Sequence, residues 1–363
     1  MATIFFTGFP GFLGRELLPR VLARRPGDRA LCLVQAKFKP DAMRAVSALV
    51  ARDPSLEGRI ELVDGDLVKG DLGLGSRRDD LAKDVAEIHH LAAVYDLDVP
   101  RDFAMRVNVD GTRHVLDFAR RCGKLERHHY VSTCYVSGRY TGPFAETDLD
   151  KGQSFSNFYE ETKFLAELDV AEARDAGMPT TVYRPSIVVG DHRTGATQKF
   201  DGPYFIIQWL LRQPRYALMP IVGDPSSFRF NVVPRDFVVD SIAYLSGLEK
   251  SRGKTYQICS PDPLTVDEMI DSIALATDKK LIRIPLGRDF AKSAIDKIPG
   301  LKGFLRIPSS SIAYFAHPTH YLCDQTVRDL EGSGISCPRL DTYLDTLVDF
   351  VKAHPEIGSK AMV

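Results

Sequence analysis

The first 190 residues alternate short apolar runs with helical patterns, and this alternation constrains the fold more than any other feature. It is typical of β-α-β units around a parallel sheet, whose strands are apolar throughout because both faces are buried. The expected strands are Thr3–Thr7, Ala30–Val34, Ile60–Val63, Glu87–Leu91, His129–Ser132 and Thr180–Arg184, and the expected helices are Gly11–Arg25, Pro40–Arg52, Asn108–Cys122 and Phe158–Ala176. The sequence therefore predicts an α/β fold with a doubly wound parallel sheet.

The pattern changes after residue 190, which predicts a smaller C-terminal lobe, mostly irregular or helical. Asp191–Asp224 is rich in Gly, Pro, aromatic and basic residues and holds one apolar helical stretch, Tyr204–Leu211. A strand is expected again at Thr255–Cys259. The expected division is a core of residues 1–190 to which 228–275 return, a lobe of 191–227 and 276–330, and a C-terminal helix and tail of 331–363.

Composition limits the classes of partner. The formal net charge is -1 and the basic residues are scattered, so nothing indicates nucleic acid. No apolar run approaches the roughly 18 residues of a membrane span, so we expect a cytoplasmic protein, with peripheral membrane association left open. The six cysteines form no C-x-x-C pair and are expected to be reduced. We predict no metal site, because neighbours within His89-His90 and His128-His129 point to opposite faces of a strand.

A glycine-rich turn between the first strand and the first helix predicts a site for a dinucleotide. The run from Thr7 to Gly14 has the spacing G-x-x-G-x-x-G. Glycines there allow a tight turn, let the backbone approach a pyrophosphate, and let the helix pack on the sheet. The helix N-terminus then offers amide donors to the phosphates. The residues expected to bind the cofactor here are Thr7, Gly8, Gly11, Phe12, Leu13 and Gly14.

The end of the second strand predicts which dinucleotide is bound. A carboxylate there hydrogen-bonds the ribose of NAD, whereas a cation suits the 2′-phosphate of NADP. The chain has Gln35, Lys37 and Lys39 and no acid, so NADP(H) is favoured over NAD(H). Asp66 and Leu67 follow the third strand, where they are expected to meet the adenine; a simple turn would give the same pattern.

Tyr159 and Lys163 are spaced to share one face of a helix. A lysine ammonium beside a phenol lowers the tyrosine pKa from about 10. Such a tyrosine can exchange a proton with a carbonyl or alcohol while a nicotinamide moves a hydride. Thr133, at the end of the fifth strand, is expected to hold the substrate oxygen, with Tyr135 beside it. Asn108 is expected to anchor a water linked to Lys163, or to cap a helix.

These residues together resemble the extended short-chain dehydrogenase/reductase superfamily, over about residues 3–275. The run Asn157–Glu167 is similar to the N-x-Y-x-x-T-K-x-L-A-E block of fatty acyl-CoA reductases, and Arg184–Val188 matches their R-P-S-I-V. The run Asn231–Asp240 resembles theirs and that of thioester reductase domains. The resemblance implies a Rossmann core, and it adds cofactor contacts from Ala92, Lys163, Pro185, Ser186 and Ile187. The usual Arg at the end of the second strand is Gln35 here.

The resemblance implies an NADPH-dependent reductase of a lipid-like carbonyl, with a fatty acyl thioester on coenzyme A or a carrier protein as the leading substrate and an aldehyde or alcohol as product. The alternatives on the same scaffold are a ketone or β-keto lipid reductase and a nucleotide-sugar epimerase or reductase. A further alternative is a dinucleotide sensor without catalysis. We expect Tyr204, Phe205 and Trp209 to line the substrate lobe, with Phe304, Leu305 and Ile307; a structural core would give the same apolar pattern.

Overall fold

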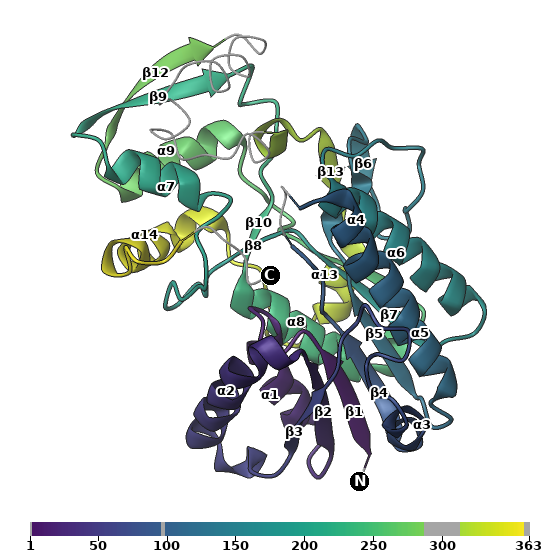
Figure 1. The fold of residues 1–363 in the computed structure, drawn as a ribbon. Helices are drawn as coiled ribbons and strands as arrows, with labels where there is room; N and C mark the ends of the chain where they lie inside the picture. The colour runs from purple at the N-terminus through teal and green to yellow at the C-terminus, as the bar shows by residue number, and fades with distance from the viewer. Residues whose placement is uncertain (1, 96–98, 287–312, 359–363) are drawn as a thin grey trace.

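The computed structural model describes residues 2–95, 99–286 and 313–358, and its centre is a seven-stranded parallel sheet (Figure 1). The strand order across the sheet is β11-β7-β5-β4-β1-β2-β3. These strands are β1 (Thr3–Thr7), β2 (Arg29–Val34), β3 (Ile60–Asp64), β4 (Val85–His90), β5 (Arg127–Val131), β7 (Thr180–Pro185) and β11 (Thr255–Ile258). The strands expected from the apolar runs agree with these bounds to within two residues.

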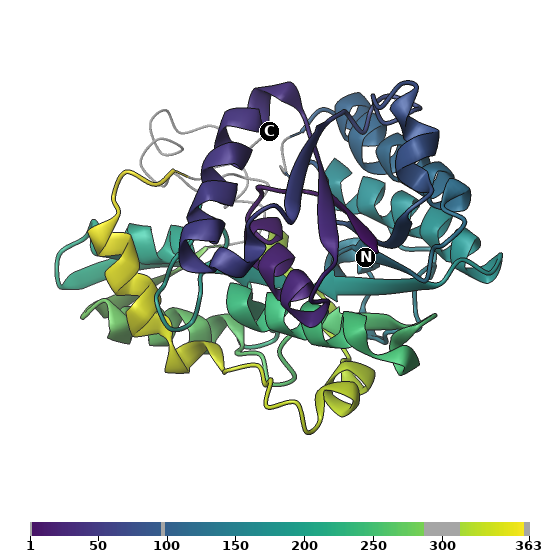
Figure 2. The ribbon, with the colours of Figure 1, turned by 90° about the horizontal axis from the view of Figure 1, so that it is seen from below.

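Helices cover both faces of the sheet, as a doubly wound fold requires. Successive side chains of β1 enter different cores: Ile4 and Phe6 pack on one face, and Phe5 packs on the other. Figure 2 shows helices on both sides of the sheet, with α8 in green on one side. The first face carries α1 (Gly14–Arg24), α2 (Lys39–Arg52) and α8 (Arg235–Gly247), and the second carries α3 (Arg77–Ala82), α5 (Gly111–Arg121) and α6 (Phe158–Asp175). The predicted fold class is confirmed.

The order of the strands places a ligand crevice beside β1. β1 pairs with β2 on one side and with β4 on the other, so the chain crosses β1 between β3 and β4. In open α/β sheets the ligand binds outside the carboxyl ends of the strands at such a switch point. The residues that follow β1, β2, β4, β5 and β7 therefore lie at this crevice.

A second hydrophobic core forms the smaller lobe (Figure 1). Its elements are α7 (Tyr204–Leu211), α9 (Val266–Ala276), α14 (Leu344–Ala353) and a parallel pair of strands, β9 (Tyr216–Val222) and β12 (Lys280–Leu286). This packing differs from the expected division, because α9 and α14 lie in the lobe. The reason is that their apolar faces, with Met269 and Leu347, bury against α7. By contrast, α13 (Asp324–Leu330) contacts α8 and β11 of the core.

Two further strand pairs connect distant parts of the chain. β8 (Ile187–Val189) pairs with β10 (Val232–Pro234), which carries the chain from the core toward the lobe and back. β6 (Gly142–Phe144) pairs with β13 (Thr319–Tyr321), which brings the segment after residue 312 beside the end of β5. A short helix, α4 (Arg101–Ala104), precedes α5. Among the described residues, no helix combines the length and apolar character needed to cross a bilayer.

Candidate active site

A cleft of about 930 Å³ runs along the carboxyl ends of β1, β2, β4, β5 and β7 and reaches the smaller lobe. This volume is within the range of small-molecule and cofactor sites. Of the residues expected at the substrate or in catalysis, Thr133, Tyr135, Tyr159, Lys163 and Phe205 line it. All the residues expected at the cofactor also line it: Thr7, Gly8, Gly11, Phe12, Leu13, Gly14, Gln35, Lys37, Asp66, Leu67, Ala92, Lys163, Pro185, Ser186 and Ile187.

The glycines of the first turn are required by close backbone contacts. Gly8 has φ +90°, and a Cβ on it would lie 2.8 Å from the Ala92 nitrogen. A Cβ on Gly14 would lie 2.4 Å from the Gly8 carbonyl oxygen and 3.3 Å from the Phe6 ring. The turn therefore folds back on itself at the point where α1 begins. Its open backbone and the first amides of α1 fit the diphosphate of a dinucleotide.

Of the polar residues expected to select the cofactor at the end of β2, Gln35 and Lys37 line the cleft and Lys39 does not. Gln35 donates a hydrogen bond of 2.8 Å from its amide nitrogen to Asp66, so these two expected cofactor residues form one polar edge of the cleft. Lys39 pairs with Asp64 at 2.8 Å and does not line the cleft. Lys37 lies over the Phe38 ring and does line it. Of the two lysines, Lys37 is therefore the one that lines the cleft.

Tyr159 and Lys163 project into the cleft from the first turns of α6. The Asn157 side chain caps this helix by accepting a hydrogen bond of 3.0 Å from the Glu160 amide. Burial raises the pKa of Tyr159 above its ordinary value, and a hydrogen bond from Thr133 acts in the opposite direction. The sequence predicts a lowered Tyr159 pKa, so this direction is a correction.

The reason is the position of the Lys163 ammonium. Lys163 donates hydrogen bonds of 2.7 Å to the Tyr130 hydroxyl and 2.9 Å to the Val131 carbonyl oxygen. Burial lowers the pKa of Lys163 to about 7, while the Glu167 carboxylate acts to raise it. The ammonium is thus directed to β5, and it does not offset the burial of the Tyr159 phenol.

Asn108 is buried and does not line the cleft. Its side chain accepts a hydrogen bond of 2.8 Å from the Val94 amide and donates to the Val94 carbonyl oxygen and the Thr162 hydroxyl. It lies in a π-helical turn, Met105–Asp110, that leads into α5. The side chain therefore joins α6 to the loop after β4. Its place inside a helical turn corrects the expectation of a helix cap, and the water linked to Lys163 stays a prediction.

The substrate side of the cleft contains one of the three expected residues of α7. Phe205 lines the cleft, whereas Tyr204 and Trp209 lie in the core of the lobe. The Tyr204 hydroxyl accepts a hydrogen bond of 2.9 Å from the Gly190 amide, and the Trp209 indole donates one of 2.9 Å to Leu218. Because α7 is apolar around its whole circumference, its sequence does not show which face meets the cleft. Phe304, Leu305 and Ile307 lie outside the described residues.

Several lining residues are not among the expected sites. Tyr95 follows β4, and its ring contacts the Tyr159 ring edge-on at 5.2 Å. Tyr314 contacts the Tyr135 ring at 4.6 Å. Further lining residues from the lobe and its connections include Asp201, Phe230 and Phe315. In the sequence, the one signal for Tyr95 is that an aromatic residue follows shortly after an expected strand. Tyr314 has no such signal, because it lies in an irregular segment without periodicity.

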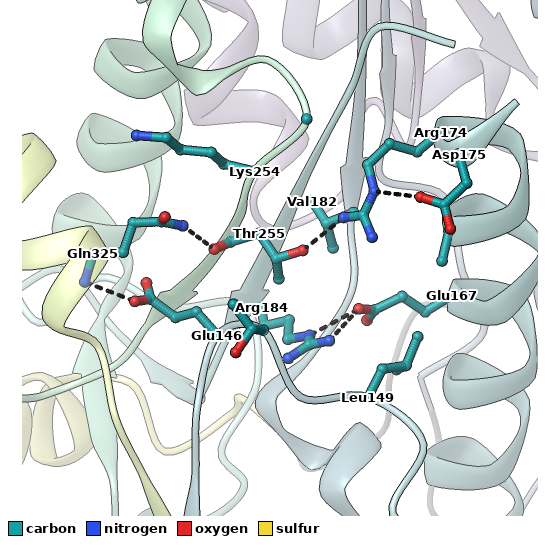
Figure 3. A pocket seen from close by; sticks show the side chains of 13 residues that line it. Glu146, Leu149, Glu167, Arg174, Asp175, Val182, Arg184, Lys254, Thr255 and Gln325 are labelled. Carbon is teal, nitrogen blue, oxygen red and sulfur yellow. Dashed lines mark hydrogen bonds and ion pairs between the residues drawn. The ribbon is translucent and has the colours of Figure 1, made fainter. Parts of the chain in front are cut away.

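A second pocket, of about 330 Å³, lies between α6, β7 and β11 (Figure 3). Arg184 and Glu167 face each other there in a buried ion pair of 2.6 Å, and the main-chain N–H of Gln325 donates a hydrogen bond to the Glu146 carboxylate (Figure 3). Arg184 belongs to the R-P-S-I-V run, whose next residues line the cleft instead. None of the expected catalytic residues borders this pocket, so the candidate active site is the larger cleft.

One buried group of possible metal ligands comes from neighbouring strands. Glu87, His89 and His129 place one ligand atom each within 4.8 Å of one another. His89 and His129 are paired residues of β4 and β5, a juxtaposition that the spacing within each histidine pair does not reveal. The Glu87 carboxylate already accepts hydrogen bonds of 2.5 Å from Arg24 and Arg25. Two guanidinium groups beside this carboxylate disfavour a bound cation.

Comparisons with known proteins agree with this geometry. A family model described as male sterility protein matches residues 6–242. One of the linear gramicidin synthase subunits of Brevibacillus parabrevis is 27% identical over 350 residues, which are 92% of this chain and 7% of that protein. Aldehyde reductase lnaA of Aspergillus flavus is 28% identical over 287 residues, which are 75% of this chain and 27% of that protein. The chain thus spans less than a third of each of these relatives.

A solved structure supports the same assignment. The terminal R domain from the myxalamid PKS-NRPS biosynthetic pathway has a TM-score of 0.82 and 28% identity, and the match covers 98% of this chain and 91% of that domain. The resemblance that the sequence motifs indicate is therefore confirmed. Because the family model matches more than half of the residues, the chain belongs to the male sterility protein family, as a thioester-reductase-like member of the extended short-chain dehydrogenase/reductase superfamily.

Proposed function

We propose that this protein reduces an acyl thioester with NADPH, giving an aldehyde and, after a second hydride, an alcohol. The observation that carries the proposal is the meeting of Thr133, Tyr159 and Lys163 in one cleft with the glycine turn. The lobe contributes aromatic side chains to the same cleft, with Phe205, Phe230 and Phe315 beside the polar Lys199 and Asp201. A cofactor at the glycine turn and an acyl chain against these rings would meet at Tyr159.

The proposed chemistry assigns one task to each residue. The nicotinamide, when bound, supplies a hydride to the carbonyl carbon. Thr133 and Tyr159 donate hydrogen bonds to the carbonyl oxygen, which becomes negatively charged as the hydride adds. Tyr159 then gives this oxygen its proton, and the resulting hemithioacetal breaks its C–S bond to release a thiol and the aldehyde. Lys163, which is held by Tyr130 and Val131 of β5, offers its remaining N–H donor to the ribose.

The thioester carrier and the cofactor are also part of the proposal. A thioester on a carrier protein is supported by the likeness to part of a linear gramicidin synthase and to a terminal R domain. A coenzyme A thioester offers the same reacting group. The likeness to an aldehyde reductase supports a second reduction of the aldehyde. NADPH is favoured over NADH because Lys37 lines the cleft at the end of β2, where the 2′-phosphate is expected.

The test is a product analysis with purified protein. NADPH oxidation is followed optically with acyl-coenzyme A thioesters, long-chain aldehydes, β-ketoacyl esters and a nucleotide-sugar, and released thiol and aldehyde are measured separately. We expect thioester-dependent oxidation with one thiol released for each molecule of aldehyde and alcohol formed together. Turnover of the nucleotide-sugar alone would contradict the proposal, and turnover of ketones without thiol release would favour a ketone reductase on the same scaffold.

A further inference from the structure

Lys163 is held by a tyrosine that no sequence motif singled out. Its ammonium donates to the Tyr130 hydroxyl at 2.7 Å, and the same nitrogen lies 4.2 Å from the centre of the Tyr130 ring. Both side chains are almost fully buried, at 3% and 1% exposure. With the bond to Val131, two of the three N–H groups of the ammonium are used within the protein. The third is left for the cleft that Lys163 lines.

The Tyr130 hydroxyl lies near a group of buried polar side chains. One of them, Thr112, acts to lower the pKa of Tyr130 and donates a hydrogen bond of 2.6 Å to the main-chain carbonyl oxygen of Asn108. His90 contacts the Thr112 hydroxyl at 3.1 Å and the Thr7 hydroxyl at 2.7 Å. Two side-chain hydroxyls, of Tyr130 and Thr112, thus lie between Lys163 and the main chain of Asn108.

We propose that Tyr130 is a positioning residue, whose phenol oxygen accepts a hydrogen bond from Lys163 and thereby keeps the buried amine charged and directed along the cleft. This inference rests on the proposed function, because the charge matters only if Lys163 assists Tyr159 and the cofactor. A neutral acceptor favours the charged form of a lysine without adding a competing charge.

Besides the main-chain carbonyl of Val131, Tyr130 is the neutral acceptor that holds Lys163, and no unpaired carboxylate faces the ammonium among the described residues. On α6, Tyr159 is an uncharged phenol, and the Glu167 carboxylate is already paired with Arg184 of β7 at 2.6 Å. On β4, burial lowers the pKa of His90 well below its ordinary value, so this ring is neutral. Burial also raises the pKa of Tyr130 well above its ordinary value, so its hydroxyl stays protonated and can accept from the ammonium.

The test compares Tyr130→Phe with Tyr183→Phe in the full chain. Tyr183 is a fully buried tyrosine of the neighbouring strand whose hydroxyl contacts His129 at 3.1 Å, so its replacement removes a buried hydroxyl without touching Lys163. The first measurement is the titration of Lys163 by carbon-13 NMR of labelled lysine, with its signal assigned by loss in Lys163→Met. It requires no turnover. The second is the pH profile of kcat and kcat/KM.

We expect Tyr130→Phe to lower the Lys163 pKa by about one unit, as the loss of a hydrogen bond to a charged group implies. The alkaline limb of kcat should move down by a similar amount, with KM little changed. Tyr183→Phe should leave both unchanged. An unaltered Lys163 pKa in Tyr130→Phe, or equal shifts in the two variants, would overturn the inference. A shifted pKa in a protein that reduces none of the substrates would retain the Tyr130–Lys163 link and reject only the proposed function.

Discussion

The Tyr95 hydroxyl donates a hydrogen bond of 2.8 Å to the Asp201 carboxylate, across 106 positions of sequence. Asp201 also pairs with Lys199 at 2.5 Å, and the Lys199 ammonium lies 3.6 Å from the centre of the Tyr95 ring. All three residues line the cleft, and Tyr95 contacts the Tyr159 ring. The contact therefore joins the loop after β4 to the segment before α7 beside Tyr159.

Breaking this contact should weaken substrate retention. Tyr95→Phe keeps the ring beside Tyr159 and removes the hydroxyl, so we expect KM for the acyl substrate to rise about fivefold, with kcat little changed, because a net hydrogen bond contributes about 1 kcal/mol. Steady-state kinetics measures both. Tyr216→Phe is the control, since Tyr216 is 61% exposed in the lobe and does not line the cleft. An equal effect in both variants would show that Tyr95–Asp201 has no part in binding.

Tyr159→Phe tests the proposed acid. We expect the dinucleotide to bind almost as in the wild type, and turnover to fall by about 10²- to 10⁴-fold, the usual contribution of general acid catalysis. Binding is measured by titration and turnover by NADPH oxidation. Tyr135→Phe serves as a comparison, because Tyr135 lines the same cleft on the side of Tyr314. Retention of most activity in Tyr159→Phe would assign the proton to another group.

Lys37→Ala tests the cofactor preference. Lys37 lines the cleft but is exposed, so its contact with a 2′-phosphate is screened and should contribute about 1 kcal/mol, or about fivefold in affinity for NADPH. NADH affinity should stay the same. Lys39→Ala is a matched control, because Lys39 pairs with Asp64 away from the cleft. Equal affinities of the wild type for NADPH and NADH would contradict the preference.

Phe205→Ala tests the apolar end of the cleft. Each buried methylene contributes about 0.8 kcal/mol, so kcat/KM of the wild type should rise about fourfold per added carbon until the groove is full. Phe205→Ala should flatten this rise for long chains only. Trp209→Phe, on the buried side of the same helix, should lower the melting temperature and leave the slope unchanged. Faster turnover of short polar substrates than of long chains would exclude the lipid assignment.

Lys163→Met should abolish activity and raise the stability of the fold, and the gain in stability should depend on pH. Burial lowers the Lys163 pKa to about 7, whereas the unfolded value is about 10.4. The buried amine therefore lowers the free energy of unfolding. This loss is complete below pH 7 and becomes smaller as the pH rises toward the pKa of the unfolded chain. We expect Lys163→Met to be inactive and to melt at a higher temperature than the wild type at pH 6, with a smaller difference at pH 9. A difference in melting temperature that does not change with pH would show that Lys163 is not a buried charge.

Much of the core could be predicted from the sequence, because its signals are local. The strand Thr3–Thr7 is apolar at every position between its terminal threonines, which only a strand covered on both faces accommodates. Gly8 and Gly14 mark the turn because a side chain at either would collide with the backbone. Tyr159 and Lys163 share a helix face by spacing alone. These properties depend on neighbours within a few residues, so the sequence by itself determined the fold class, the cofactor cleft and the Tyr159–Lys163 pair.

The partners of those residues were decided only by the tertiary structure. The helix α7 is apolar all round, so the sequence could not show that Phe205 faces the cleft while Trp209 faces the core. Lys163 turns to Tyr130, which lies on a different strand and follows no spacing rule relative to it. Tyr95 meets Asp201 because two loops from the core and the lobe converge on one cleft. Helix and strand periods record which side of an element is buried, but the choice among buried partners depends on how the elements pack, and that packing is a property of the whole chain.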